Sequence, residues 1–161
     1  MFVLWIILGA MTAKAVEWLD GKLRIVDQSR LPHELIFADL DDYRDVVVAI
    51  REMKVRGAPA IGVVAAYGMA LGAAGIKTSN KDDFLAQLNQ IAQAFAASRP
   101  TAVNLFQAID KMKKAAIGDR VAEVKKSLVN EARRIHQKEI SATEKLSQLG
   151  AELIKDGFAV L

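Results

Sequence analysis

None of the 161 residues of this chain is cysteine, which excludes disulfide bonds, a thiol nucleophile and thiolate metal ligands within these residues. Proline is scarce, with 3 residues, and neither sign of charge dominates: 22 Lys and Arg residues are interspersed with 19 Asp and Glu residues, a formal net charge of +3. The charge balance gives no indication of a nucleic-acid partner, and we expect none. The lack of cysteine fits a reducing compartment, and we expect a cytoplasmic protein.

The chain begins with an apolar run, MFVLWIILGA at residues 1–10, that is shorter than the about 20 residues needed to span a bilayer. No basic residue precedes the run, and Ala10 and Ala13 resemble a signal-peptide cleavage site only weakly. The run is either an element that packs on the body or an upstream extension, with natural translation starting at Met11. We favour the extension, because ordinary domain sequence begins at Thr12.

Hydrophobic residues make up 52% of the chain, enough at this length for one compact domain with its own core. Short extended runs between Val16 and Leu40, separated by Gly21 and Pro32, predict a small β-meander. After Asp41-Asp42, which suits the N-terminus of a helix, apolar residues recur every three or four positions. The predicted fold class is therefore α+β, mainly α: an N-terminal β-meander followed by a helical bundle.

The most apolar predicted helix covers residues 60–74 and follows Pro59, a residue tolerated in a first turn. At about 15 residues it is short for a bilayer span, so we predict a buried core helix and no membrane partner. The other predicted helices run from a cap at Ser79 or Asn80 to Pro100, from 102 to about 117, and from 118 through 156. A capping-box pattern at Ser141–Glu144 leaves open whether the last stretch is one helix or two. Gly157 then suits a helix end, and Phe158–Leu161 reads as the start of a buried strand, as if the chain were cut at a domain junction.

Arg56, Gly57 and Ala58 precede Pro59, so they lie at the predicted start of the buried helix. Free backbone N–H groups and the positive end of the helix dipole favour an anion there. Glycine lets a ligand approach the backbone, and arginine can grip a phosphate with two parallel hydrogen bonds. The alternative, a surface arginine beside a glycine that ends the preceding helix, is equally probable on chemistry alone.

Arg99 repeats this arrangement, because it directly precedes Pro100 at the start of another predicted helix. Two such corners would suit one phosphorylated ligand, although a capped surface turn is the simpler explanation of the second corner taken alone. Other polar residues are predicted to be structural: His33 and His136 as solvated histidines without metal-ligand spacing, Asp39, Asp41 and Asp42 as a helix cap, and Lys111, Lys113, Lys114, Lys125 and Lys126 as solvated helix faces.

Three segments resemble the methylthioribose-1-phosphate isomerase family: VEWLDGKLRIVDQSRLP at residues 16–32, MKVRGAPAIGVVAAYGMAL at 53–71 and SRPTAVNLFQAIDKM at 98–112. The parent family also includes ribose-1,5-bisphosphate isomerase and the regulatory subunits of translation initiation factor 2B. The resemblance implies a cytoplasmic, usually homodimeric enzyme of methionine salvage that converts 5-methylthioribose 1-phosphate to 5-methylthioribulose 1-phosphate without a metal or organic cofactor.

By the same resemblance, Arg56, Gly57 and Ala58 would contact the substrate and Arg99 would help to bind its phosphate. Gln107 stands where the family often has tryptophan. The resemblance places the catalytic cysteine and aspartate in a following Rossmann-like domain, so no catalytic residue is assigned here. The expected domains are an apolar extension at 1–11, a substrate-clamping domain at 12–156 and the start of the Rossmann-like domain at 157–161.

We therefore expect the chain to be inactive alone and to act as a homodimer or with a separately encoded C-terminal half. The alternatives are a non-catalytic interaction module of the initiation-factor type and a fragment of a ribose-1,5-bisphosphate isomerase.

Overall fold

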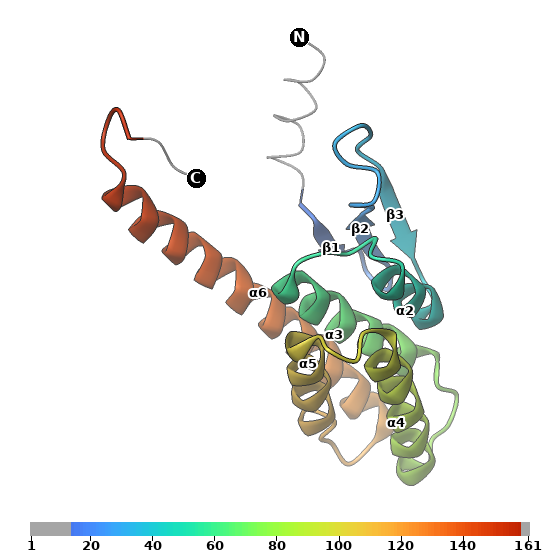
Figure 1. Ribbon diagram of the computed structural model, residues 1–161. Coiled ribbons are helices and arrows are strands. Elements are labelled where there is room, and N and C mark those ends of the chain that lie inside the picture. The colour runs from blue at the N-terminus through green and yellow to red at the C-terminus, as the bar shows by residue number, and fades with distance from the viewer. Residues whose placement is uncertain (1–13, 159–161) are drawn as a thin grey trace.

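The computed structural model describes residues 14–158, in which a three-stranded antiparallel sheet packs on a helical bundle (Figure 1). The predicted α+β, mainly α fold is confirmed. In chain order the elements are β1 (Val16–Trp18), β2 (Leu23–Val26), β3 (Phe37–Leu40), α2 (Tyr43–Arg51), α3 (Ala58–Gly75), α4 (Lys81–Ser98), α5 (Val103–Lys114) and α6 (Val121–Leu153). The apolar extension predicted at 1–11 lies outside the described residues. So does the predicted terminal strand, except for Phe158, which is exposed.

The sheet is the predicted β-meander, with strand order β1-β2-β3. Asp20 and Gly21 both have positive φ, as a two-residue hairpin turn requires, and Leu19 and Lys22 exchange two backbone hydrogen bonds across that turn. Arg24 on β2 lies opposite Asp39 on β3 and donates two hydrogen bonds to its carboxylate, at 2.6 and 2.8 Å. Asp39 is thereby occupied in an exposed cross-strand ion pair, which stabilises the sheet only modestly.

Helix α3 is the centre of the bundle and contacts α2, α4, α5, α6 and two strands. It is the one helix within residues 14–158 whose length and composition would suit a membrane, and 72% of it is buried inside the protein. The prediction of a buried core helix is confirmed. Neighbouring elements approach α3 closely at some of its glycines. At Gly62, for example, an added methyl group would lie 3.0 Å from the carbonyl oxygen of Asn104.

Side chains cap two of the helices at predicted positions. The Asp42 carboxylate accepts a hydrogen bond from the backbone N–H of Arg44 at 2.8 Å, at the start of α2. Asn80 accepts from the N–H groups of Asp82 and Asp83 at the start of α4. Each cap satisfies donors that the helix itself leaves free, which explains why these helices begin where they do.

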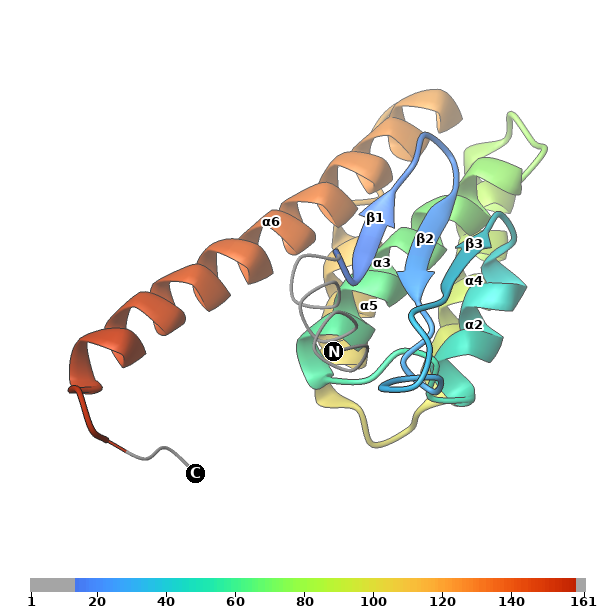
Figure 2. The same cartoon turned by 90° about the horizontal axis from the view of Figure 1, so that it is seen from above.

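Helix α6 is a single continuous helix, so the capping-box pattern at Ser141–Glu144 does not divide it. It starts where the Glu123 carboxylate accepts hydrogen bonds from the N–H groups of Asp119 and Arg120. Its first half packs on α3, whereas its second half extends away from the bundle (Figures 1 and 2). Apolar side chains are strongly exposed on this second half, with Leu146 at 72% and Leu153 at 76%.

The prediction that Lys125 lies on a solvated helix face is wrong. Its ammonium group donates hydrogen bonds to the carbonyl oxygens of Ala74 at 3.1 Å and Ile76 at 2.7 Å. These carbonyls belong to the C-terminal end of α3, where a cation also complements the helix dipole. Lys125 therefore fastens the first half of α6 to the end of the core helix.

We predict that Gly68→Ala destabilises the fold by about 1–3 kcal/mol, because overpacking a filled core costs this much. A Cβ at Gly68 would overlap the Phe95 ring and lie 2.9 Å from Val46 Cγ1. Gly150→Ala is the matched control: nothing lies within 4 Å of its added carbon, and alanine favours a helix by up to about 1 kcal/mol. Urea unfolding of both variants measures the difference, and equal stabilities would contradict the close packing of α3.

Candidate substrate-binding site

The loop that precedes α3 carries the predicted clamp. Gly57 is the N-cap residue, with φ 89° and ψ 128°, a conformation that a side chain would strain. No side chain caps this helix start, in contrast to α2 and α4. Arg56 and Ala58 are exposed, and the Arg56 Nε donates a hydrogen bond to the carbonyl oxygen of Met53 at 3.2 Å. The first turn of α3 therefore presents backbone donors and a nearby guanidinium to solvent.

The second corner is built differently, because Pro100 lies in the turn before α5, ahead of the N-cap residue Ala102, whereas Pro59 lies within the first turn of α3. Arg99 is half-buried at the C-terminal end of α4, and its carbonyl accepts a hydrogen bond from the N–H of Ala102 at 3.0 Å. Ala102 is the N-cap residue of α5, and it supplies no side-chain cap. Helix α5 therefore also begins with backbone donors that no side chain satisfies.

The fold brings these two corners to one edge of the molecule. Figure 2 shows the loop before α3 and the loop between α4 and α5 on the same edge. The second turn of α3 contacts the first turn of α5, because Gly62 packs against the backbone of Asn104. Gln107 lines a small cleft beside them, together with Pro59 and Lys111. Two positive helix ends thus lie next to each other, although the aim of both arginines at one ligand stays a prediction.

A groove of about 870 Å³ lies beside the clamp, between β1, α3 and α6, and both apolar and charged side chains line it, Glu17, Arg133 and Glu139 among the charged ones. We name it the aromatic groove; its lining residues include Trp18, Pro59, Ala60, Val63, Tyr67 and His136. Trp18 stacks on Tyr67, with ring centroids 5.2 Å apart and planes 11° apart. His136 meets the same tyrosine ring edge-on, with centroids 5.6 Å apart.

The prediction that His136 is a solvated histidine is wrong. It is half-buried, and its Nδ1 lies 3.1 Å from the Tyr67 hydroxyl oxygen, within hydrogen-bonding distance. Burial, with a smaller contribution from the charge of Lys14, lowers the pKa of His136 from 6.5. Burial raises the pKa of Tyr67, against a smaller opposing effect of Arg133. At neutral pH the aromatic groove therefore contains a neutral tyrosine–histidine pair.

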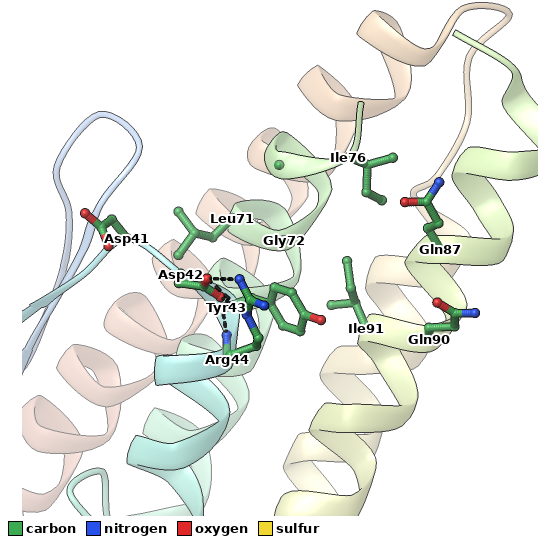
Figure 3. A pocket seen from close by; sticks show the side chains of 11 residues that line it. Asp41, Asp42, Tyr43, Arg44, Leu71, Gly72, Ile76, Gln87, Gln90 and Ile91 are labelled. Carbon is green, nitrogen blue, oxygen red and sulfur yellow. Dashed lines mark hydrogen bonds and ion pairs between the residues drawn. The ribbon is translucent and has the colours of Figure 1, made fainter. Parts of the chain in front are cut away.

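A second pocket, of about 280 Å³, is centred on Tyr43, Gly72 and Ile91 (Figure 3). Its arginine, Arg44, is bound to Asp42 by hydrogen bonds from Nε, at 2.9 and 3.1 Å, and the bonds to Arg44 lower the pKa of that carboxyl. The pocket lies at the C-terminal half of α3, and the whole helix is roughly 27 Å long at 1.5 Å per residue. It is therefore remote from the clamp at Gly57 and forms no part of the candidate site.

Within residues 14–158, no three histidine, aspartate or glutamate side chains gather in a way that could hold a metal ion. His33 is exposed, as predicted. No catalytic pair is evident among the described residues near the clamp, so the chemistry available there is binding and orientation of an anionic ligand. The aromatic groove is the feature that the sequence did not predict. Trp18, Tyr67 and His136 are far apart along the chain, so no local pattern indicated that their rings meet.

We predict that the His136 imidazole titrates below pH 6.5. Since the unfolded chain binds the proton more readily than the folded chain, the free energy of unfolding should fall as pH falls from 6.5 toward the lowered pKa. NMR titration gives the midpoint, and urea unfolding at several pH values gives the stability. His136→Gln should remove this part of the pH dependence, and a wild-type midpoint at or above 6.5 would contradict the burial of the ring.

Comparison with known proteins agrees with the arrangement of these elements. The chain is 50% identical over 149 residues to the methylthioribose-1-phosphate isomerase of Dehalococcoides mccartyi, a match that covers 92% of this chain and 45% of that protein. The crystal structure of 5-methylthioribose 1-phosphate isomerase from Pyrococcus horikoshii superposes with a TM-score of 0.85 at 34% identity, over 89% of this chain and 41% of that one.

A second solved structure, translation initiation factor eIF-2B, subunit delta, from A. fulgidus, superposes with a TM-score of 0.83 at 35% identity, over 91% of this chain and 43% of that one. The chain thus spans less than half the length of the relatives it matches. Residues 54–161, which begin two positions before the clamp, match the family model described as the initiation factor 2 subunit family. Because this model matches more than half of the chain and the solved relatives share its fold, the chain belongs to the initiation factor 2 subunit family.

Proposed function

We propose that this chain is the substrate-clamping part of a sugar-phosphate isomerase that converts 5-methylthioribose 1-phosphate to 5-methylthioribulose 1-phosphate. One observation carries the proposal: the two arginine–proline corners, far apart in the sequence, precede or open two helices that pack against each other and have no side-chain cap. The 50% identity to a protein named methylthioribose-1-phosphate isomerase supports the choice of substrate. A cytoplasmic, homodimeric enzyme of methionine salvage is part of the same proposal.

The physical basis is the match between a phosphate and two helix N-termini. A phosphate accepts several hydrogen bonds, and the N–H groups of Ala58 and Ala60 in α3, and of Val103 in α5, are placed in first turns. Arg56 and Arg99 would add charge-assisted hydrogen bonds. Gly57 lacks a Cβ that would obstruct the approach.

The proposed clamp holds the substrate but supplies no acid or base to it. By resemblance, the catalytic cysteine and aspartate would lie in a following domain, so positioning is the contribution we assign to this chain. The second half of α6 offers a surface for the part of the relatives that this chain does not match. Leu146, Leu149 and Leu153 are spaced three and four residues apart on one helical stripe and are each more than half exposed.

A non-catalytic module of the initiation-factor type is the second candidate. The observation in its favour is that the A. fulgidus initiation-factor structure superposes as well as the isomerase does, with TM-scores of 0.83 and 0.85. The fold is therefore common to both classes, and a binding experiment must separate them.

We predict that the 161-residue chain alone does not isomerise 5-methylthioribose 1-phosphate. Mixed with the complementary part of the Dehalococcoides mccartyi relative, the part that its match with this chain leaves out, it should give measurable turnover. A coupled assay of the product follows the reaction. Turnover by the chain alone would contradict the proposal that this chain binds the substrate but does not supply the catalytic residues. Failure of the mixture, together with no effect of the sugar phosphate on thermal unfolding of the chain, would favour the non-catalytic module.

We further predict that Arg99→Ala and Arg56→Ala each raise the dissociation constant for the sugar phosphate by about ten-fold or more, as loss of a hydrogen bond to a charged group costs about 1.5–3 kcal/mol. Arg51→Ala is the matched control, because Arg51 is an exposed arginine in the last turn of α2. Calorimetric titration measures all three variants. Unchanged affinity in Arg99→Ala would remove that residue from the site.

A further inference from the structure

We propose that Met53 is a positioning residue of the clamp: its left-handed backbone conformation directs its carbonyl oxygen to Arg56, and this contact holds the guanidinium ready for a phosphate at the start of α3. The inference rests on the proposed function and adds a residue that belongs to neither arginine–proline corner. Met53 acts through its backbone, because its carbonyl oxygen accepts the hydrogen bond from Arg56 Nε.

The conformation of Met53 is the first argument. Within residues 14–158, Met53 and Asp20 are the two residues other than glycine with a positive φ, at 59° and 43°. Aspartate tolerates this conformation in a turn, whereas a side chain without a short polar group strains it. The Met53 side chain is 45% exposed, so burial of that side chain does not explain the strain. Strained residues of this kind persist where the surrounding backbone holds them, and they gather at functional sites.

The end of α2 holds Met53 in this conformation. The N–H of Met53 donates a hydrogen bond to the carbonyl oxygen of Ile50 at 3.2 Å, and the N–H of Lys54 donates to that of Ala49 at 3.0 Å. These two bonds form the Schellman motif, whose left-handed position is usually occupied by glycine. The chain therefore leaves the helix at Met53, and the carbonyl of Met53 accepts a bond from a side chain instead of from the helix.

The residues between Met53 and Arg56 are also held in place. The carbonyl oxygen of Lys54 accepts a hydrogen bond from the N–H of Gln28 at 2.9 Å, which ties this link to the loop after β2. Val55 is 1% exposed and belongs to the hydrophobic core. The backbone that carries the arginine is thus fixed before any ligand binds, so the contact between Arg56 and the carbonyl does not depend on a flexible loop.

The bond to Met53 leaves the part of the guanidinium that recognises phosphate. It uses the Nε–H donor alone, at 3.2 Å, and within residues 14–158 neither terminal nitrogen of Arg56 has a hydrogen-bond or ion-pair partner. Arg24 and Arg44, in contrast, are bound to carboxylates. Two terminal nitrogens suffice for a two-point grip on a phosphate. An arginine that is already held at Nε loses less rotamer freedom on binding, and its affinity for the ligand rises accordingly.

Substitutions at Met53 separate the backbone from the side chain. Met53→Val should raise the dissociation constant for 5-methylthioribose 1-phosphate about two- to ten-fold, the range for one hydrogen bond, because a β-branched residue disfavours positive φ. Met53→Gly and Met53→Asn, which tolerate positive φ, should keep the affinity within about two-fold. Asp20→Val is the matched control, because it places valine at the other left-handed position, in the turn between β1 and β2, and should leave the affinity unchanged. Calorimetric titration measures the affinities, and circular dichroism melting establishes that each variant is folded.

A double-mutant cycle tests whether Met53 acts through Arg56. Met53→Val should weaken binding no further in an Arg56→Ala background, whereas its effect should multiply with that of Arg99→Ala. A second measurement needs no ligand and no substitution. In the ¹⁵N–¹H spectrum of the wild-type chain, the Nε–H of Arg56 should exchange with water more slowly than that of the exposed Arg51.

The outcomes separate this inference from the proposed function. Equal losses of affinity in the glycine, asparagine and valine variants would place the Met53 side chain at the ligand and overturn the backbone role, with the clamp intact. Unchanged affinity in a folded Met53→Val variant, or equal exchange of the Arg56 and Arg51 Nε–H groups, would overturn it as well. A wild-type chain that binds no sugar phosphate would overturn the proposed function and this inference together.

Discussion

The burial of α3 is the constraint on which the rest of the structure depends. A helix without a polar face must be covered on all sides, and here α2, α4, α5, α6 and the sheet cover it. Its two ends are the places where its backbone polar groups need partners. Lys125 satisfies carbonyls at the C-terminal end, whereas no side chain caps the N-terminal end. The clamp is therefore the open end of the core helix, and the positions of α5 and of the aromatic groove follow from packing around it.

The sequence predicted those features that depend on local pattern. The Asp20-Gly21 turn, the caps at Asp42 and Asn80 and the apolar run of α3 each have a short-range cause, and the structure confirms the elements they define. The two corners could also be located from sequence, because proline and glycine mark helix starts. That they lie on one edge could not, since the contact between Gly62 and Asn104 joins residues that are far apart along the chain.

The two errors have the same physical origin. His136 and Lys125 both stand on α6 among polar neighbours, so the helical pattern assigned them to solvent. Their actual partners, Tyr67 and the carbonyls that end α3, lie about 50 to 70 residues earlier in the chain. A polar side chain at the margin of a packed interface buries its stem or ring while its polar atom finds a partner, which local periodicity does not reveal. The sequence also left open whether the helix divides near Ser141, and the structure shows that α6 continues through this position.

The central claim is that the first turns of α3 and α5 bind a phosphate together, and backbone amide shifts in a ¹⁵N–¹H NMR titration with 5-methylthioribose 1-phosphate test it most directly. The account predicts the largest shifts at Ala58, Ala60, Val103 and Asn104, all saturating with one dissociation constant. Shifts confined to the pocket around Arg44, or different dissociation constants for the α3 and α5 amides, would contradict it.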